Sequence, residues 1–116
     1  MRIMIVEDEP LLAMLLEESL RELGHDVVAS AATVEQGLAE LDAREIDMAL
    51  LDFTLGEDSD AVPIAVRLSE RGIPFAYLTG HRSLPQGRAI PPAPLLMKPF
   101  TIDELDATLK GMKLAA

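Results

Sequence analysis

Five polar side chains follow directly after short apolar runs: Glu7 and Asp8 after one run, and Asp52, Thr79 and Lys98 after three others. Carboxylate oxygens suit Mg²⁺, which binds one or two carboxylates together with a phosphate oxygen. A carboxylate can also act as a nucleophile that forms an aspartyl-phosphate, and phosphoryl transfer needs positive charge around the transferred group. Asp52 could therefore attack, Mg²⁺ and Lys98 could supply the charge, and Thr79 could donate a hydrogen bond.

These side chains come together if the apolar runs are parallel strands of one sheet. In an open parallel sheet, ligands bind beyond the carboxyl ends of the strands. Five short runs mostly separated by helical patterns predict an α/β fold, in which helices cover both faces of a parallel sheet. The expected strands are Arg2–Val6, Asp26–Ser30, Met48–Leu51, Phe75–Leu78 and Leu95–Met97.

Helix signals fill most of the intervals between these strands. Pro10 is suited to a first helical turn, and Gly24 offers a stop after the first helix. Thr33 with Gln36, and Thr101 with Glu104, have the spacing of capping boxes. Asp60 is expected to be the N-cap of the third helix. The expected helices are Leu11–Leu23, a helix from Thr33 to about Leu41, Ala61–Arg71, and a helix from Thr101 to about Leu114.

The interval from Gly80 to Pro94 breaks this rhythm because it is rich in proline, above all at Pro91, Pro92 and Pro94. Proline lacks an N–H and disfavours helix at the residue before it. We expect at most a turn or two of helix near Leu84–Ala89, followed by an extended approach to the last strand. The fourth helix is therefore expected to be short or absent.

Composition limits the class of protein. The 116 residues fit one domain over 1–116, and 49 % of them are apolar. The lack of cysteine excludes disulfides, thiolate metal sites and cysteine nucleophiles. The net charge of −10 opposes direct binding to nucleic acid. No apolar run approaches the ~18–20 residues of a membrane span, and Met1 does not open a signal peptide. We expect a cytoplasmic protein.

Each of the polar residues also has an ordinary structural interpretation. Asp8 could cap the first helix, and Asp52 could be a turn residue. Thr79 before Gly80 could belong to a simple turn, and Lys98 could be a solvated lysine. Because all of them follow expected strands of one sheet, we favour a shared site over separate structural roles.

These residues resemble the receiver domain of bacterial response regulators over the whole chain. The matching segments are Ile5–Pro10 with its acidic pair, Leu50–Asp52, Thr79-Gly80 and Lys98-Pro99-Phe100. The resemblance implies a flavodoxin/CheY-like fold whose five parallel strands have the order 2-1-3-4-5.

The resemblance also implies a role for each site residue. Asp52 would be the phosphorylation site, Thr79 the switch hydroxyl and Lys98 the cation that pairs with the phosphoryl group. Mg²⁺ would be bound by Asp8, by Glu7 through water, by Asp52 and by the backbone carbonyl of Thr54. The phosphodonor would be a histidine kinase or a phosphotransfer protein, and no turnover of an external substrate is expected.

Three features depart from the common family pattern. Gly80 replaces alanine, Leu95 stands where an aromatic switch residue is common, and the fourth helix is reduced. The segment Pro74–Gly80 resembles a subgroup of alphaproteobacterial single-domain regulators with a Phe-Ala-Thr-Gly-type motif, although Tyr77 and Leu78 replace Phe and Ala. We expect a stand-alone receiver, while a chain cut from a longer regulator would look similar.

Two other functions share part of this pattern. A haloacid-dehalogenase-type phosphatase also uses an aspartate nucleophile, Mg²⁺ and a lysine, but it needs a second carboxylate where this chain has Thr54. A phosphorylation-independent interaction module would not need the intact set of site residues.

Signalling without an output domain would depend on contacts with partners, which include a possible phospho-dependent output protein. We hypothesise that Gly80–Pro94 changes conformation on phosphorylation, because a segment without regular helix has few backbone bonds to break. His25 and His81 have no identifiable partner in the sequence pattern, and we expect a surface role for both, although His81 lies close enough to the site to influence the attack of water.

Overall fold

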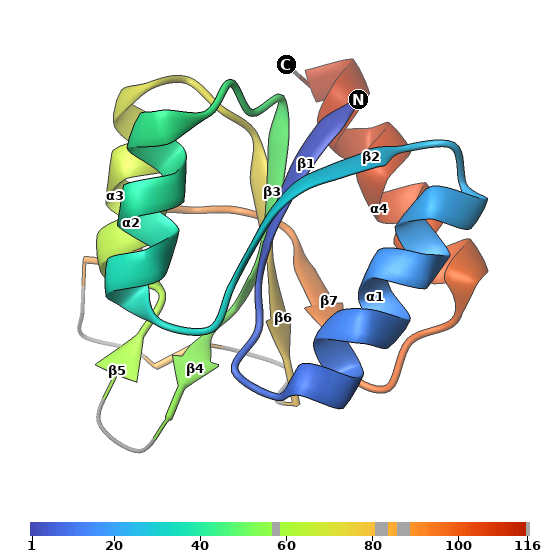
Figure 1. Cartoon of the computed structure of the whole chain (residues 1–116), viewed down its shortest axis with the longest axis horizontal. Coiled ribbons are helices and arrows are strands. Elements are labelled where there is room, and N and C mark those ends of the chain that lie inside the picture. Colours follow the sequence, from blue (N-terminus) through green and yellow to red (C-terminus); the bar gives the residue numbers. More distant parts are fainter. Residues whose placement is uncertain (57–58, 81–83, 86–88, 116) are drawn as a thin grey trace.

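The computed structural model describes residues 1–56, 59–80, 84–85 and 89–115. Five parallel strands form one sheet in the order β2-β1-β3-β6-β7 (Figure 1). This is the expected order 2-1-3-4-5, because β6 and β7 are the fourth and fifth strands of this sheet along the chain. The strands of this sheet are β1 (Arg2–Val6), β2 (Asp26–Ala31), β3 (Met48–Asp52), β6 (Phe75–Thr79) and β7 (Leu95–Met97).

A second, two-stranded antiparallel sheet follows β3 and was not expected from the sequence. Its strands are β4 (Thr54–Leu55) and β5 (Ser59–Asp60). The two strands are too short for an alternating pattern of polar and apolar residues, and such a pattern is the usual sequence signal of a strand. Gly56, with φ of 76°, follows β4 in a backbone conformation that favours glycine.

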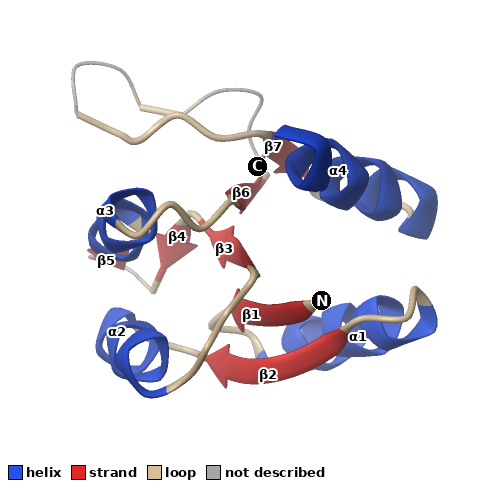
Figure 2. Cartoon of the chain, turned by 90° about the horizontal axis from the view of Figure 1, so that it is seen from above, coloured by secondary structure: helices blue, strands red, loops and turns tan. Residues whose placement is uncertain are grey.

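Four helices cover the main sheet among the described residues. Figure 2 shows α1 and α4 on one face and α2 and α3 on the other. One expected capping box forms in full, since Thr101 and Glu104 cap each other at 3.0 and 3.1 Å. The other forms in part: Gln36 N–H donates to Thr33 Oγ1 at 3.1 Å, but the side chain of Gln36 accepts from Ala32 N–H at 2.9 Å and not from Thr33 N–H. The helices are α1 (Pro10–Glu22), α2 (Val34–Ala43), α3 (Val62–Glu70) and α4 (Ile102–Ala115).

The expected N-cap of the third helix is wrong by one residue. Ala61 occupies the N-cap position of α3, and it has no side chain that can accept a hydrogen bond. Asp60 belongs to β5, and its Oδ1 accepts from Val62 N–H at 3.0 Å. The carboxylate therefore still satisfies a first-turn donor, from a position shifted by the hairpin.

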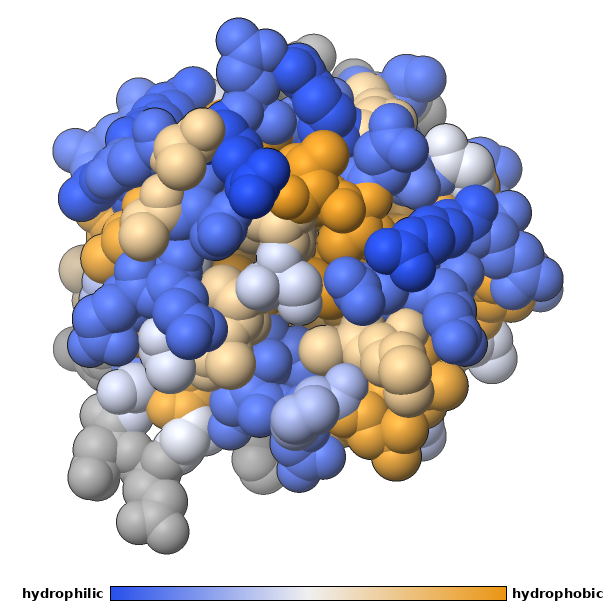
Figure 3. Space-filling view, viewed as in Figure 1, coloured by the Kyte–Doolittle hydropathy of each residue, from blue (hydrophilic) through white to orange (hydrophobic). Residues whose placement is uncertain are grey.

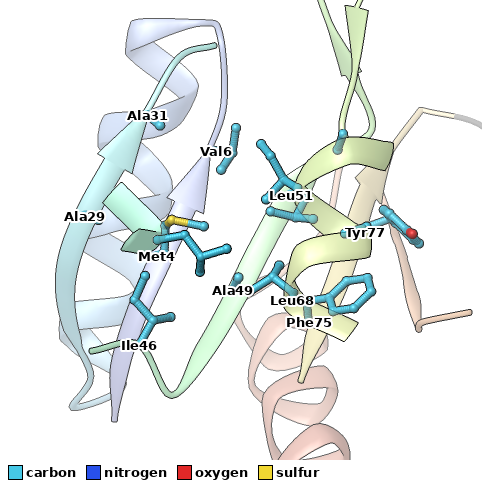
Figure 4. Packing of buried hydrophobic residues seen from close by; sticks show 14 of the residues in the cluster. Met4, Val6, Ala29, Ala31, Ile46, Ala49, Leu51, Leu68, Phe75 and Tyr77 are labelled. Atoms are coloured by element: carbon cyan, nitrogen blue, oxygen red, sulfur yellow. The ribbon is translucent and has the colours of Figure 1, made fainter. Parts of the chain in front are cut away.

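Two apolar cores lie on opposite faces of the sheet because successive strand residues point to opposite sides. One core joins the sheet to α2 and α3, and Figure 4 shows Met4, Leu51 and Tyr77 among its members. The other joins the sheet to α1 and α4. The strands β1, β3 and β6 lie in the middle of the sheet, so nearly all of their side chains are buried.

The connection between β6 and β7 has neither helix nor strand at residues 84–85 and 89–94. Part of the expected short turn near Leu84–Ala89 lies outside the described residues. Leu84, Ile90 and Ala93 pack against the core on the α2 and α3 face. An irregular proline-rich segment therefore covers sheet surface that a helix could have covered.

Across the described part of the chain, no helix combines the length and apolar character that crossing a membrane requires.

Candidate functional site

The register of the parallel strands places the polar side chains at one edge of the sheet. The pairing of β1 with β3 ends at the residues before Glu7 and Asp52. Asp52 pairs with the residue before Thr79, and Thr79 pairs with the residue before Lys98. The four side chains thus come from neighbouring strands at nearly the same level, as the sequence predicted.

Lys98 joins the two buried carboxylates of this edge. Its Nζ lies 2.9 Å from Glu7 Oε2 and 3.2 Å from Asp52 Oδ1. The carboxylate-bearing side chains are 2 % and 12 % exposed, whereas that of Lys98 is 26 % exposed. Because a buried carboxylate without a partner is costly, the ammonium is needed to keep both acids at this position.

Glu7, Asp8 and Asp52 form a group that fits a divalent cation. Each offers a carboxylate oxygen, and these oxygens lie within 4.8 Å of one another. Three carboxylates and one ammonium leave two negative charges, which a divalent ion would balance. Hard oxygen donors suit Mg²⁺. The expected role of the Thr54 carbonyl as a ligand stays a prediction.

Asp8 has a second contact that the sequence did not predict. Its Oδ2 accepts a hydrogen bond from Gly56 N–H at 3.0 Å, which links the β1–α1 turn to the β4–β5 hairpin. A carboxylate has two oxygens, so this bond leaves the other oxygen available to a cation. The signal that could have revealed Gly56 is its position in a polar turn, but only the fold brings that turn beside Asp8.

The environment of Asp52 disfavours its charged form in the absence of a divalent cation. Burial raises the pKa of Asp52 to about 7, and the charges of Glu7 and Asp8 act in the same direction. The charge of Lys98 opposes this rise, as does its hydrogen bond. A divalent cation would likewise favour the charged carboxylate. Asp52 therefore needs positive charge close by to be a nucleophile at neutral pH.

Burial lowers the pKa of Lys98, but the hydrogen bond to Glu7 and the charge of Asp52 outweigh it, so the pKa is raised overall. Lys98 is consequently a permanent cation of the site. Thr79 is 6 % exposed, and its carbonyl accepts a 2.7 Å hydrogen bond from Lys98 N–H. The main chain thus holds the hydroxyl-bearing residue and the ammonium-bearing residue side by side.

An apolar groove of about 490 Å³ opens beside the site. Glu7 and Lys98 line it together with residues of α1 and of the loop after β7. The exposed leucines of α1 give this part of the surface an apolar character, and Figure 3 shows apolar surface over the N-terminal half of the helix, at the lower right. The apolar residues lining the groove are Leu12, Leu15, Leu16, Leu78, Pro99 and Phe100.

The two histidines do not join the described site. His25 precedes β2, so it lies at the edge of the parallel sheet opposite the acidic residues. It is half-buried, where a surface position was expected, and its buried Nδ1 has no hydrogen-bond partner among the described residues. Burial is the main reason why the pKa of His25 is lowered. His81 lies outside the described residues.

The sheet order, the helices on both faces and the lysine-bridged acidic edge define a fold class, the response-regulator receiver. The model of the response regulator receiver domain family matches residues 3–110. The chain belongs to this family.

Known proteins resemble the chain over nearly its full length. The transcriptional regulatory protein TcrA of Mycobacterium tuberculosis is 33 % identical over 96 % of this chain and 45 % of its own length. The response regulator PhyR of Brucella abortus has a TM-score of 0.85 and 34 % identity, over 98 % of this chain and 48 % of its own. SdrG of Sphingomonas melonis has a TM-score of 0.81 and 36 % identity, over 97 % and 95 %.

The chain spans about half the length of the curated relatives that it matches first, and nearly the whole of SdrG. The matches to PhyR proteins and to SdrG confirm the resemblance to alphaproteobacterial receivers that was drawn from the Thr79-Gly80 region.

Proposed function

We propose that this chain is a phospho-acceptor that receives a phosphoryl group on Asp52 in a Mg²⁺-dependent reaction. The observation that carries the proposal is the position of Asp52. It is nearly buried, it lies 3.2 Å from the ammonium of Lys98, and it shares a cluster with Glu7 and Asp8. Membership of the receiver family supports the same function.

The proposed transfer follows from these side chains. A carboxylate oxygen of Asp52 attacks the phosphorus of a phosphohistidine, the P–N bond breaks, and the imidazole leaves with the bonding electrons and takes up a proton. Asp8, Asp52, the carbonyl of Thr54 and, through water, Glu7 would hold Mg²⁺, and the bound ion would supply positive charge to the phosphoryl oxygens. Lys98 pairs with one of these oxygens, and Thr79 donates its hydroxyl to another.

We propose that the donor, a histidine kinase or a phosphotransfer protein, docks at the apolar groove beside α1. The groove is continuous with the site because Glu7 and Lys98 line both. Leu12 and Leu15 are 39 % and 49 % exposed, which is apolar area that a partner helix can bury. The net charge of −10 favours a partner that carries basic residues around its apolar contacts.

The phosphorylated receiver domain would signal through contacts with other proteins in the cytoplasm. The added charge at Asp52 would draw Thr79 and Lys98 toward it. Both residues flank the segment from Gly80 to Pro94, so we propose this segment as the part that changes conformation and is read by an output partner.

Incubation with acetyl phosphate and Mg²⁺ tests the proposal. We expect an alkali-labile adduct with the mass of one phosphoryl group in the wild type, none in Asp52→Asn, and none when EDTA removes the cation. Transfer from a purified phosphohistidine protein would extend the result to the natural class of donor. Absence of the wild-type adduct would point to a phosphorylation-independent interaction module instead.

Assays with a generic phosphate ester separate this function from that of a phosphatase. Thr54 takes the place where haloacid-dehalogenase-type enzymes need a second carboxylate. We therefore expect no sustained release of phosphate from external esters, and steady turnover that depends on Asp52 would contradict the assignment.

A further inference from the structure

Tyr77 occupies a central position between the acceptor strand and the proline-rich segment. Its side chain is fully buried in β6. The ring makes edge-to-face contacts with Phe53 and Phe75, with centroid distances of 5.6 and 5.5 Å. Figure 4 shows its hydroxyl directed away from the sheet, toward the neighbouring segment. Packing on both sides leaves the ring little freedom to move independently of β6.

The hydroxyl of Tyr77 holds the proline-rich segment. It donates a hydrogen bond to the carbonyl of Pro91 at 2.8 Å, and the backbone N–H of Tyr77 donates to the carbonyl of Pro94 at 2.9 Å. Prolines contribute no N–H donors, so the segment cannot form the internal bonds of a helix here. One residue of β6 therefore binds it at two points, while Ile90 and Ala93 pack on the adjacent core.

The same residue is connected to the acceptor. Phe53 directly follows Asp52, and its N–H donates to the carbonyl of Leu78 at 3.0 Å. Thr79 lies two residues after Tyr77 on the same strand, so both side chains are on one face of the sheet. A displacement at the end of β6 must therefore act on the ring of Tyr77 and, through its hydroxyl, on Pro91.

Burial raises the pKa of Tyr77 to about 12, and the charge of Asp60 adds to this effect. The hydroxyl consequently keeps its proton at neutral pH and stays a donor to Pro91.

From these contacts we propose that Tyr77 is a positioning residue that couples occupancy of the Asp52 site to the conformation of residues 89–94 through its hydrogen bond to Pro91. The proposal rests on the proposed phospho-acceptor function. In this proposal, Tyr77 links the Asp52 site to the connection between β6 and β7, whose described residues form no helix.

Tyr77→Phe tests the coupling because it keeps the ring and removes the donor to Pro91. Hydrogen exchange is measured at Ala89, Ile90 and Ala93 with and without beryllofluoride and Mg²⁺, which mimic the phosphoryl group. In the wild type we expect the mimic to change exchange at these amides. In Tyr77→Phe we expect exchange that is already about fivefold faster without the mimic, as for the loss of one hydrogen bond, and a much smaller further change.

Phe75→Leu is the matched control, since it removes one ring contact of Tyr77 and keeps the hydroxyl. We expect this variant to lose global stability but to retain the change that beryllofluoride causes at residues 89–94. The proposal is overturned if Tyr77→Phe retains the full wild-type change, or if the wild type shows no change there. A wild type that forms no adduct at Asp52 would instead refute the phospho-acceptor function.

The wild type provides a second measurement that needs no variant. Tyr77 is the single tyrosine and tryptophan is absent, so absorbance at the long-wavelength tyrosine band, beyond that of the three phenylalanines, and tyrosine fluorescence report this residue alone. We expect beryllofluoride with Mg²⁺ to shift both signals, and not to do so in Asp52→Asn. Unchanged signals in a protein that binds the mimic would overturn the coupling even if Tyr77→Phe failed to fold.

Discussion

Two connections leave the same edge of the sheet and differ in how they are held. The turn after β1 carries Glu7 and Asp8 and leads directly into α1, which anchors it to one core through Leu16 and Leu20. The connection after β6 has no helix among its described residues and is held by Tyr77 and a few apolar side chains. The first arrangement suits a cation site of fixed geometry, and the second suits a part that changes conformation.

Lys98 is linked to both regions. It directly follows β7, the strand to which the irregular connection leads, and its ammonium pairs with Glu7 and Asp52. Lys98→Gln should therefore have the largest effect. We expect phosphorylation of Asp52 by acetyl phosphate to slow by a factor of about ten or more, as for loss of one charged group that stabilises a transition state. We also expect the pKa of Asp52 to rise above about 7, which carboxyl ¹³C NMR can measure.

Lys98→Arg, which keeps the charge, is the control for this variant and should retain part of the rate. An unchanged rate in Lys98→Gln would show that the divalent cation at the acidic cluster supports transfer without the lysine.

Truncating one isoleucine to alanine in each region compares how tightly the two regions are packed. Ile5 of β1 is fully buried, whereas Ile90 of the irregular connection is only partly buried. We expect Ile5→Ala to lower the free energy of unfolding by about 3 kcal/mol and Ile90→Ala by about 1 kcal/mol. Urea unfolding measures both values, and equal losses would contradict the proposed difference between the regions.

The pH dependence of stability tests the acidic cluster. The pKa of Asp52 is about 7 in the fold against an ordinary value of 3.8, so the folded state binds the proton more tightly. Without a divalent cation, Asp52 therefore favours the fold below about pH 4, and this contribution is lost as the pH rises through 7. We expect Asp52→Asn to be more stable than the wild type by about 2 kcal/mol at pH 8.

Thermal unfolding at several pH values measures this difference, which should shrink toward pH 4 and when Mg²⁺ is added. A difference in stability between the two proteins that stays constant at all pH values would show that burial and the acidic neighbours do not disfavour the charged form of Asp52.

A surface variant separates donor docking from the chemistry of the site. Leu15→Glu places a charge in the groove beside α1 and should slow transfer from a phosphohistidine protein about tenfold, while leaving labelling by acetyl phosphate unchanged. Val66→Glu is the matched control, because Val66 is 41 % exposed on α3, across the sheet from the groove. Equal slowing by both variants would indicate a general charge effect.

Much of the fold follows from local sequence. The apolar runs predicted the strands of the main sheet to within a residue at most ends, and the expected caps formed at Thr33 and Thr101, the second as a full capping box. The candidate residues Glu7, Asp8, Asp52 and Lys98 do come together, because the register of a parallel sheet aligns strand ends. The β4–β5 hairpin was missed because two-residue strands carry no periodic pattern.

The sequence by itself determined the strands, the helix starts to within a residue and the set of polar residues at the strand ends, because these depend on periodicity, caps and prolines within short stretches of chain. The strand order was expected only from the resemblance to receiver domains. Only the tertiary structure decided that Gly56 N–H meets Asp8, that α1 and Phe100 enclose a groove beside Lys98, and that the hydroxyl of Tyr77 reaches Pro91. These contacts join residues far apart in the chain. They depend on how whole elements pack on the sheet, which no local pattern specifies.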